Sequence, residues 1–105
     1  MATVTYTKRS DGVVSFAHGS FTGDGSAQTI SLGFVPNHMI VFNETDALLW
    51  EKFQPMAAAN CIKTVTAGTQ TADTSSAIVF NSDGTVTLSA ALAANGKAIK
   101  FRASL

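Results

Sequence analysis

The sequence predicts an all-β domain, an antiparallel β-sandwich that is jelly-roll-like and has about seven to nine short strands. Short apolar or alternating segments recur along the chain, and turn signals rich in Gly, Asp and Asn separate them every ~8–12 residues. No segment has the apolar periodicity of a helix longer than about one turn. Because 105 residues suit one domain, we expect residues 1–105 to form a single β domain.

The N-terminal residues have a weaker strand pattern. Residues 2–9 alternate mildly, with Val4 and Tyr6 on one side, and residues 13–16 form a second short apolar segment. Two interpretations stay open for residues 1–10. They form either the first strand of the same sheet or an extended arm that reaches a neighbouring subunit.

Residues 19–42 hold the clearest succession of strands and turns. A turn is predicted at residues 23–26, Gly-Asp-Gly-Ser, because glycine adopts positive φ without strain and aspartate tolerates it. Residues 29–34 then alternate, which places Ile30, Leu32 and Phe34 on one side of a strand.

Pro36 should end that strand, because it has no N–H for the sheet. Residues 39–42 (MIVF) are continuously apolar, which predicts a strand covered on both faces. A short buried helix is the alternative, but the proline and the β-branched Ile40 and Val41 favour the strand.

The next two predicted strands lie at residues 47–53 and 61–66, followed by a polar loop at 67–76. Alternation over residues 47–53 mixes apolar and charged side chains on both sides, with Leu49, Glu51 and Phe53 on one and Leu48, Trp50 and Lys52 on the other. Because neither side is uniformly apolar, we expect a strand that bends or lies near a sheet edge, with Trp50 partly exposed.

The last third predicts a hairpin and a final strand. Residues 77–80 and 85–88 flank an Asn-Ser-Asp-Gly turn at residues 81–84, which is typical of a hairpin with a four-residue loop. A further turn at residues 94–96 precedes a strand over 98–104. That strand should point Ile99, Phe101 and Ala103 inward and Lys100 and Arg102 outward.

Charge and cysteine content narrow the classes of function. Only 13% of residues are charged and the formal net charge is zero, which suits a surface partly covered by partners and does not suit a nucleic-acid binder. Cys61 is the only cysteine, so neither an internal disulfide nor a cysteine-based zinc site can form. Without the apolar core of a signal peptide or a membrane span, we expect the protein to be made and assembled inside a cell, without secretion and without membrane association.

Residues 19–42 resemble a segment that recurs in virion proteins of tailed bacteriophages. Residues 19–25 (GSFTGDG) match its aromatic and glycine turn, and residues 28–34 (QTISLGF) match an alternating run that ends in Gly-Phe. Pro36 and the apolar residues 39–42 complete the segment. The likeness implies a β domain of the kind found in tail fibres and in small head or tail proteins.

The C-terminal part is similar to the same domains. The turn at residues 81–84 is followed by Leu-Ala-Ala-Asn-Gly-Lys at residues 92–97, and such domains often carry a comparable turn before their last strand. No stalk, collagen-like or coiled-coil segment accompanies the domain here. The resemblance therefore implies a small virion component, either a capsid decoration (cement) protein or an accessory protein.

Catalytic and metal-binding patterns are weak. His18 and His38 flank the central strand, and Asp24 or Glu44 could be drawn as a third metal ligand, but nothing in the spacing requires it. Cys61 with a histidine could form a nucleophile pair, although a small buried side chain is the simpler interpretation.

The remaining carboxylates also have ordinary explanations. Glu44, Asp46 and Glu51 could be arranged for glycoside cleavage, yet they lie at a polar turn and the strand after it, where solvated carboxylates are expected. Asp24 and Asp83 are more simply interpreted as turn residues than as calcium ligands, because calcium needs six or more oxygen ligands. We therefore predict no catalytic residue, no cofactor and no metal, and hence no enzyme.

Two functional hypotheses remain. The first is a virion structural subunit that forms a dimer or trimer and binds neighbouring virion proteins such as the major capsid protein. The second is a tail-fibre or lectin-like module that binds host-surface glycan through Trp50, Tyr6 or His38. For the first hypothesis we predict interface residues at Val4, Tyr6, Lys8, Arg9 and Trp50.

Overall fold

A computed structural model describes residues 5–10 and 15–105, and the side chains from residue 16 onward. The described residues form strands and loops, with no helix long and apolar enough to cross a membrane. The ten strands are β1 (Thr5–Ser10), β2 (Ser15–Thr22), β3 (Gln28–Ser31), β4 (His38–Asn43), β5 (Leu48–Phe53), β6 (Cys61–Thr64), β7 (Gln70–Asp73), β8 (Ile78–Phe80), β9 (Thr85–Leu88) and β10 (Ala98–Ser104). The predicted all-β class is confirmed.

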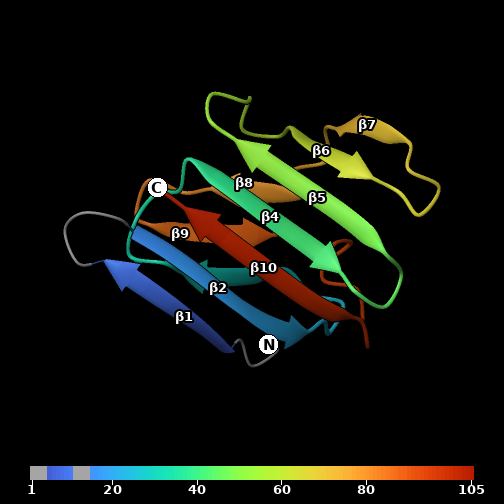
Figure 1. The fold of residues 1–105 in the computed structure, drawn as a ribbon, viewed down its shortest axis with the longest axis horizontal. Coiled ribbons are helices and arrows are strands. Elements are labelled where there is room, and N and C mark those ends of the chain that lie inside the picture. The colour runs from blue at the N-terminus through green and yellow to red at the C-terminus, as the bar shows by residue number, and fades with distance from the viewer. Residues whose placement is uncertain (1–4, 11–14) are drawn as a thin grey trace.

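The strands form two antiparallel sheets that pack as an uneven sandwich (Figure 1). The large sheet has seven strands in the order β1-β2-β10-β4-β5-β6-β7, and the small sheet has three in the order β3-β9-β8. The jelly-roll topology is not confirmed, because the strands divide seven to three and the large sheet is built mainly from pairings between neighbours in the chain. One additional strand, β7, lies within the segment 67–76 that the sequence predicted to be a loop.

The core lies between the sheets, and the alternation of the strands explains which residues enter it. Ile99, Phe101 and Ala103 of β10 point inward, as predicted, while Lys100 and Arg102 are exposed. The buried apolar core consists of Ala17, Phe21, Ile30, Leu32, Met39, Val41, Trp50, Cys61, Ala77, Ile78, Val86, Leu88, Leu92, Ala93, Ile99, Phe101 and Ala103.

The predicted alternation after the first turn is mostly confirmed. Ile30 and Leu32 are buried, whereas Phe34 is only half-buried and packs against the edge of the core. Strand β3 ends at Ser31, before the expected stop at Pro36. The backbone leaves the sheet there because the N–H groups of Leu32 and Gly33 both bond to the Gly84 carbonyl, at 3.0 and 3.1 Å.

The prediction that residues 39–42 are covered on both faces is wrong for the isolated chain. Strand β4 alternates: Met39 and Val41 are fully buried, but Ile40 is half-buried and Phe42 is 36% exposed. Only the small sheet's side of β4 is covered in the described part of the chain. The apolar run therefore supplies one face of the core and one open face.

Trp50 and its strand also differ from the prediction. Strand β5 lies between β4 and β6, inside the sheet and away from its edge. Trp50 is buried, with 3% of its surface exposed, so the expectation of a partly exposed tryptophan is wrong. Lys52 is buried on the same side, because its ammonium group has polar partners that the sequence pattern does not show.

For residues 5–10 the structure distinguishes between a strand of the same sheet and an extended arm. Residues 5–10 form β1, which pairs antiparallel with β2 at one end of the large sheet, with Thr7 opposite His18. The interpretation as a strand of the same sheet therefore holds for these residues. Val4 lies outside the described residues.

The two motifs that resemble phage virion domains are in direct contact. The N–H groups of Gly23 and Gly25 bond to the carbonyls of Lys97 and Ala93, at 2.9 and 3.0 Å, and the N–H of Gly96 bonds to the Gly23 carbonyl at 2.8 Å. A Cβ atom on Gly23 would lie 2.1 Å from the Ala94 carbonyl oxygen, so only glycine fits there. The two turns thus hold each other in place through their backbones.

Replacing Phe101 by Ala should lower the free energy of unfolding by about 3–5 kcal/mol, because its ring is buried in the core. Phe34→Ala should lower this free energy less, because Phe34 is only half-buried. Phe53 is 42% exposed on the same sheet as Phe101, so Phe53→Ala should lower it by less than about 1 kcal/mol. Urea unfolding followed by Trp50 fluorescence measures all three. Equal losses for Phe101→Ala and Phe53→Ala would contradict the inward orientation of Phe101.

Gly23→Ala should destabilise the chain by about 3 kcal/mol or more, because the new methyl group would overlap backbone atoms of Ala93 and Ala94. The control is Gly68→Ala, where φ is +87° but a Cβ atom would meet nothing within 4 Å. Backbone strain alone should then cost about 1–2 kcal/mol. Thermal melting distinguishes the two, and an equal shift in both variants would rule out the close approach.

Candidate functional site

One face of the large sheet is left uncovered by the described chain (Figure 1). The small sheet lies behind the large one in that view, so the side turned to the viewer faces solvent. We call its outward side chains on five adjacent strands the outer face: Phe16, His18, Ser20, Lys100, Arg102, His38, Ile40, Phe42, Leu49, Glu51, Phe53, Ile62 and Thr64. It spans five of the seven strands of the large sheet.

The outer face is rich in apolar side chains for a solvent-facing surface. Phe42 and Phe53 are 36% and 42% exposed, and Ile40, Leu49 and Ile62 beside them are half-buried. Contiguous apolar side chains rimmed by polar ones mark sites of association, whereas single exposed ones are ordinary. The outer face therefore has the composition of a protein-binding surface.

A shallow groove of about 250 Å³ runs over the outer face between β4 and β10. Ile40 and Phe42 form its apolar wall, and Lys100 and Arg102 line the other side. Long basic side chains can lay their apolar stems along such a surface while their charged ends stay in water. The groove can accept an apolar side chain from a partner next to an acidic one.

Charge is distributed unevenly across the outer face. Lys100 and Arg102 both lie on β10, whereas Glu51 lies on β5, on the opposite side of β4. A hydrogen bond of 2.6 Å joins His38 Nε2 to Glu51 Oε2. One flank of β4 is thus basic and the other carries a carboxylate.

Of the predicted interface residues, none has a side chain that the structure shows on this face. Tyr6, Lys8 and Arg9 lie on β1, whose backbone alone is described. The indole of Trp50 is buried on the opposite side of its sheet. Trp50 therefore offers no exposed ring to a partner or a sugar.

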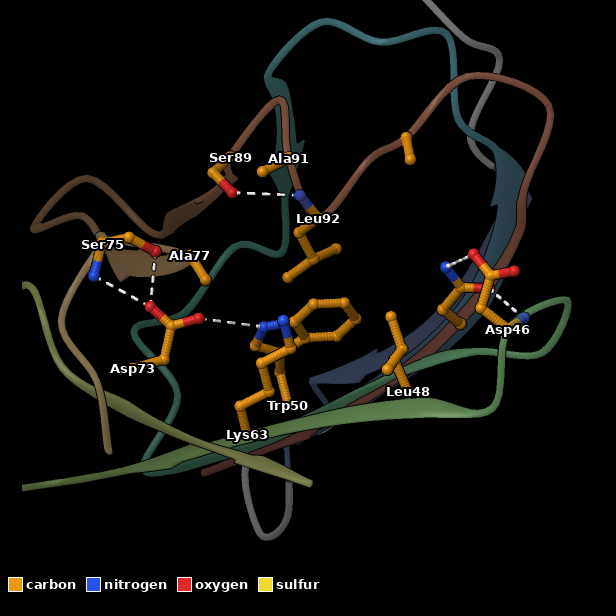
Figure 2. A pocket seen from close by; sticks show the side chains of 12 residues that line it. Asp46, Leu48, Trp50, Lys63, Asp73, Ser75, Ala77, Ser89, Ala91 and Leu92 are labelled. Carbon is orange, nitrogen blue, oxygen red and sulfur yellow. Dashed lines mark hydrogen bonds between the residues drawn. The ribbon is translucent and has the colours of Figure 1, made fainter. Parts of the chain in front are cut away.

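A second cavity lies on the inner side of the large sheet, around Trp50 (Figure 2). Its volume is about 240 Å³, and Leu48 and Trp50 of β5 face Ala91 and Leu92 across it. Figure 2 shows Asp73 and Asp46 at its two ends. Ser89, Ala91 and Leu92, in the segment after β9, close the cavity on the side opposite the large sheet.

The polar groups of this cavity are largely engaged with one another. Trp50 Nε1 donates to Asp73 Oδ2 at 3.3 Å, and Lys63 Nζ lies 5.3 Å from the centroid of the Trp50 ring. Burial would raise the pKa of Asp73, but hydrogen bonds from Ser75 and Trp50 outweigh it and hold that pKa below its ordinary value. The cluster stabilises the buried indole, and it presents no nucleophile and base pair.

The histidines and the cysteine are separated by the sheet. His18 and His38 both belong to the outer face, with the His18 ring stacked on that of Phe16 at 5.9 Å, while Cys61 is buried on the inner side. Within residues 5–10 and 15–105, no group of three or more His, Cys, Asp or Glu side chains is placed to hold a metal ion. The imagined pairing of Cys61 with a histidine is therefore contradicted.

Two interactions were missed by sequence reasoning. The His38–Glu51 pair joins diagonal neighbours on β4 and β5, because the register sets His38 opposite Phe53 and Glu51 opposite Ile40, and the sequence does not give that register. Lys52 gave no signal either: its ammonium group donates to the carbonyls of three residues in the following loop. The acceptors are Ala57 at 2.9 Å, Ala58 at 3.1 Å and Asn60 at 2.7 Å. Burial lowers the pKa of Lys52.

Cys61 should not react with Ellman's reagent in the native protein at pH 8. The side chain is fully buried, and burial together with the nearby Asp73 raises the pKa of the thiol from 9.0 to about 11, so the reactive thiolate is scarce. In denaturant, one thiol per chain should react at once. Rapid labelling of the native protein would contradict the burial of Cys61.

Comparisons with protein families, with curated proteins and with solved structures found no match for this chain. The resemblance of residues 19–42, 81–84 and 92–97 to phage virion domains therefore stays a prediction from the sequence.

Proposed function

We propose that the chain is a structural subunit of a phage virion, a capsid decoration (cement) or accessory protein. It acts by association, both with itself and with neighbouring virion proteins such as the major capsid protein. No catalysis and no cofactor are part of this function. The subunit would be made in the host cytoplasm and would end up on the particle.

The observation that carries the proposal is the outer face. The described residues cover the seven-stranded sheet on one side only, and the other side exposes phenylalanines such as Phe42 and Phe53. Burying apolar area on a partner gains about 25 cal/mol per Å² before the costs of association. A surface of this kind favours a binding protein over one that works alone.

Sequence features add support in the same direction. Residues 19–42 and residues 81–84 and 92–97 resemble phage virion domains, and the turns at 23–25 and 93–97 within them are joined by backbone hydrogen bonds. Only 13% of the residues are charged, which is low for a protein whose whole surface stays in contact with solvent. Both features agree with a subunit whose surface is partly covered in a particle.

The alternative function, glycan binding by a tail-fibre or lectin-like module, has less support. Its main candidate residue was Trp50, which is buried and has its indole N–H bonded to Asp73. His38 is half-buried and paired with Glu51. A sugar platform usually needs an exposed aromatic ring, and these two residues do not provide one.

The test is binding to capsid shells assembled from the major capsid protein encoded in the same genome. Purified chain mixed with these shells should co-sediment with them and raise the temperature at which they disrupt. The double variant Phe42→Asp with Phe53→Asp should bind at least about tenfold more weakly, because it puts two charges on the apolar surface.

The matched control places the same aspartate away from the outer face. Thr74 is exposed in the loop after β7, so Thr74→Asp should bind shells like the unmodified chain. Circular dichroism checks that all variants remain folded. Absence of shell binding by the unmodified chain would refute the proposed function, and equal binding by the double variant would refute the role of the outer face in shell binding.

A further inference from the structure

We propose that a second copy of this chain covers the outer face, with the two copies related by a two-fold axis that runs along β4. The inference rests on the proposed function, since it specifies the surface and symmetry of the self-association. Three observations carry it: the position of β4, the distribution of charge around it, and the size of the face.

The first observation is that β4 is the central strand of the large sheet, with three strands on either side. Its outward residues Ile40 and Phe42 form an apolar ridge along that centre. A two-fold axis along β4 packs each ridge residue against its own counterpart. It also brings the full width of one sheet over the other, as in a β-sandwich.

The second observation is that charges of opposite sign lie on the two sides of β4, Lys100 and Arg102 on β10 and Glu51 on β5. The strand register places Arg102 of β10 opposite Ile40, and Ile40 opposite Glu51 of β5, so the three lie in one row across the sheet. Rotation about β4 exchanges the two flanks. Arg102 of one copy then faces Glu51 of the other, and the pair occurs twice.

The chemistry of that pair is favourable. Glu51 Oε2 is bonded to His38 at 2.6 Å, which leaves Oε1 to accept a hydrogen bond from the guanidinium group of the other copy. In the next row across the sheet, Phe42 lies between Lys100 of β10 and Leu49 of β5. The rotation therefore places Lys100 against Leu49 of the second copy, where the apolar stem of the lysine can cover apolar surface. No like charges are brought together in these two rows.

The third observation is size. The molecule is flat, with principal extents of 39 × 29 × 19 Å, and the outer face lies across its two longer dimensions. A specific interface buries about 800 Å² on each partner, which a face of this size can provide. The mixture of exposed phenylalanines and a few charges is also typical of such interfaces.

A charge-reversal series tests the proposal by sedimentation velocity over a range of concentrations. The unmodified chain should be a dimer. Arg102→Glu and Glu51→Arg should each raise the dissociation constant by more than about tenfold, because each places like charges opposite each other twice. The double variant Arg102→Glu with Glu51→Arg restores both pairs and should dimerise again.

Lys97→Glu is the matched control, because it changes the net charge by as much as Arg102→Glu but lies outside the outer face, in an exposed pair with Asp46. It should remain dimeric. A monomer or trimer of the unmodified chain would overturn the proposal, as would single variants that dimerise normally or a double variant that stays monomeric. Melting temperatures confirm that each variant is folded.

The same samples separate this inference from the proposed function. A monomeric chain that still binds capsid shells would refute the two-fold pairing and leave the virion function standing. A chain that dimerises through Arg102 and Glu51 but never binds shells would support the pairing and refute the virion function.

Discussion

The fold depends on the contact between two turns that lie about 70 residues apart in the chain. Gly23 and Gly25 donate backbone hydrogen bonds to Lys97 and Ala93, and Gly96 donates one back to Gly23. Residues 23–25 follow β2 and lead into the small sheet, while residues 93–97 lead from the small sheet into β10. Because backbone meets backbone, the contact needs a residue without Cβ at position 23. These two of the four crossings between the sheets are thereby fixed side by side.

The two layers of the sandwich differ in width, with seven strands in one sheet and three in the other. Three strands cannot cover seven completely, so loops complete the inner side around β5 and β6, next to β8. Buried polar groups in this region have hydrogen-bond partners: Lys52 donates to three loop carbonyls, and Trp50 donates to Asp73. Buried polar groups cost stability unless they are hydrogen-bonded, and these are bonded. On the opposite side of the large sheet, the described residues leave the outer face uncovered.

The sequence predicted the elements better than their surroundings. Turn residues such as Gly84, at φ +85°, and the alternation of β10 located the C-terminal hairpin and the last strand correctly. Predictions failed where burial depends on distant partners. The alternation along residues 47–53 allows either side of the strand to face the core. The side with Trp50 and Lys52 faces inward because carbonyls of the loop at residues 57–60 accept hydrogen bonds from the Lys52 ammonium group. The outer face was missed because its members come from five strands whose order the sequence does not give.

The error at residues 39–42 is informative about the surface. A continuous apolar run is typical of a strand with two covered faces, yet the described chain covers only Met39 and Val41 and leaves Phe42 36% exposed. Selection for folding alone would place a polar residue at Ile40 and Phe42, as it places Lys100 and Arg102 on the neighbouring strand. An apolar ridge at the centre of an open sheet is therefore explained if the strand acquires its second cover from another polypeptide. On this view the periodicity of β4 describes the assembled state, and the single chain is only half of the environment to which that strand is adapted.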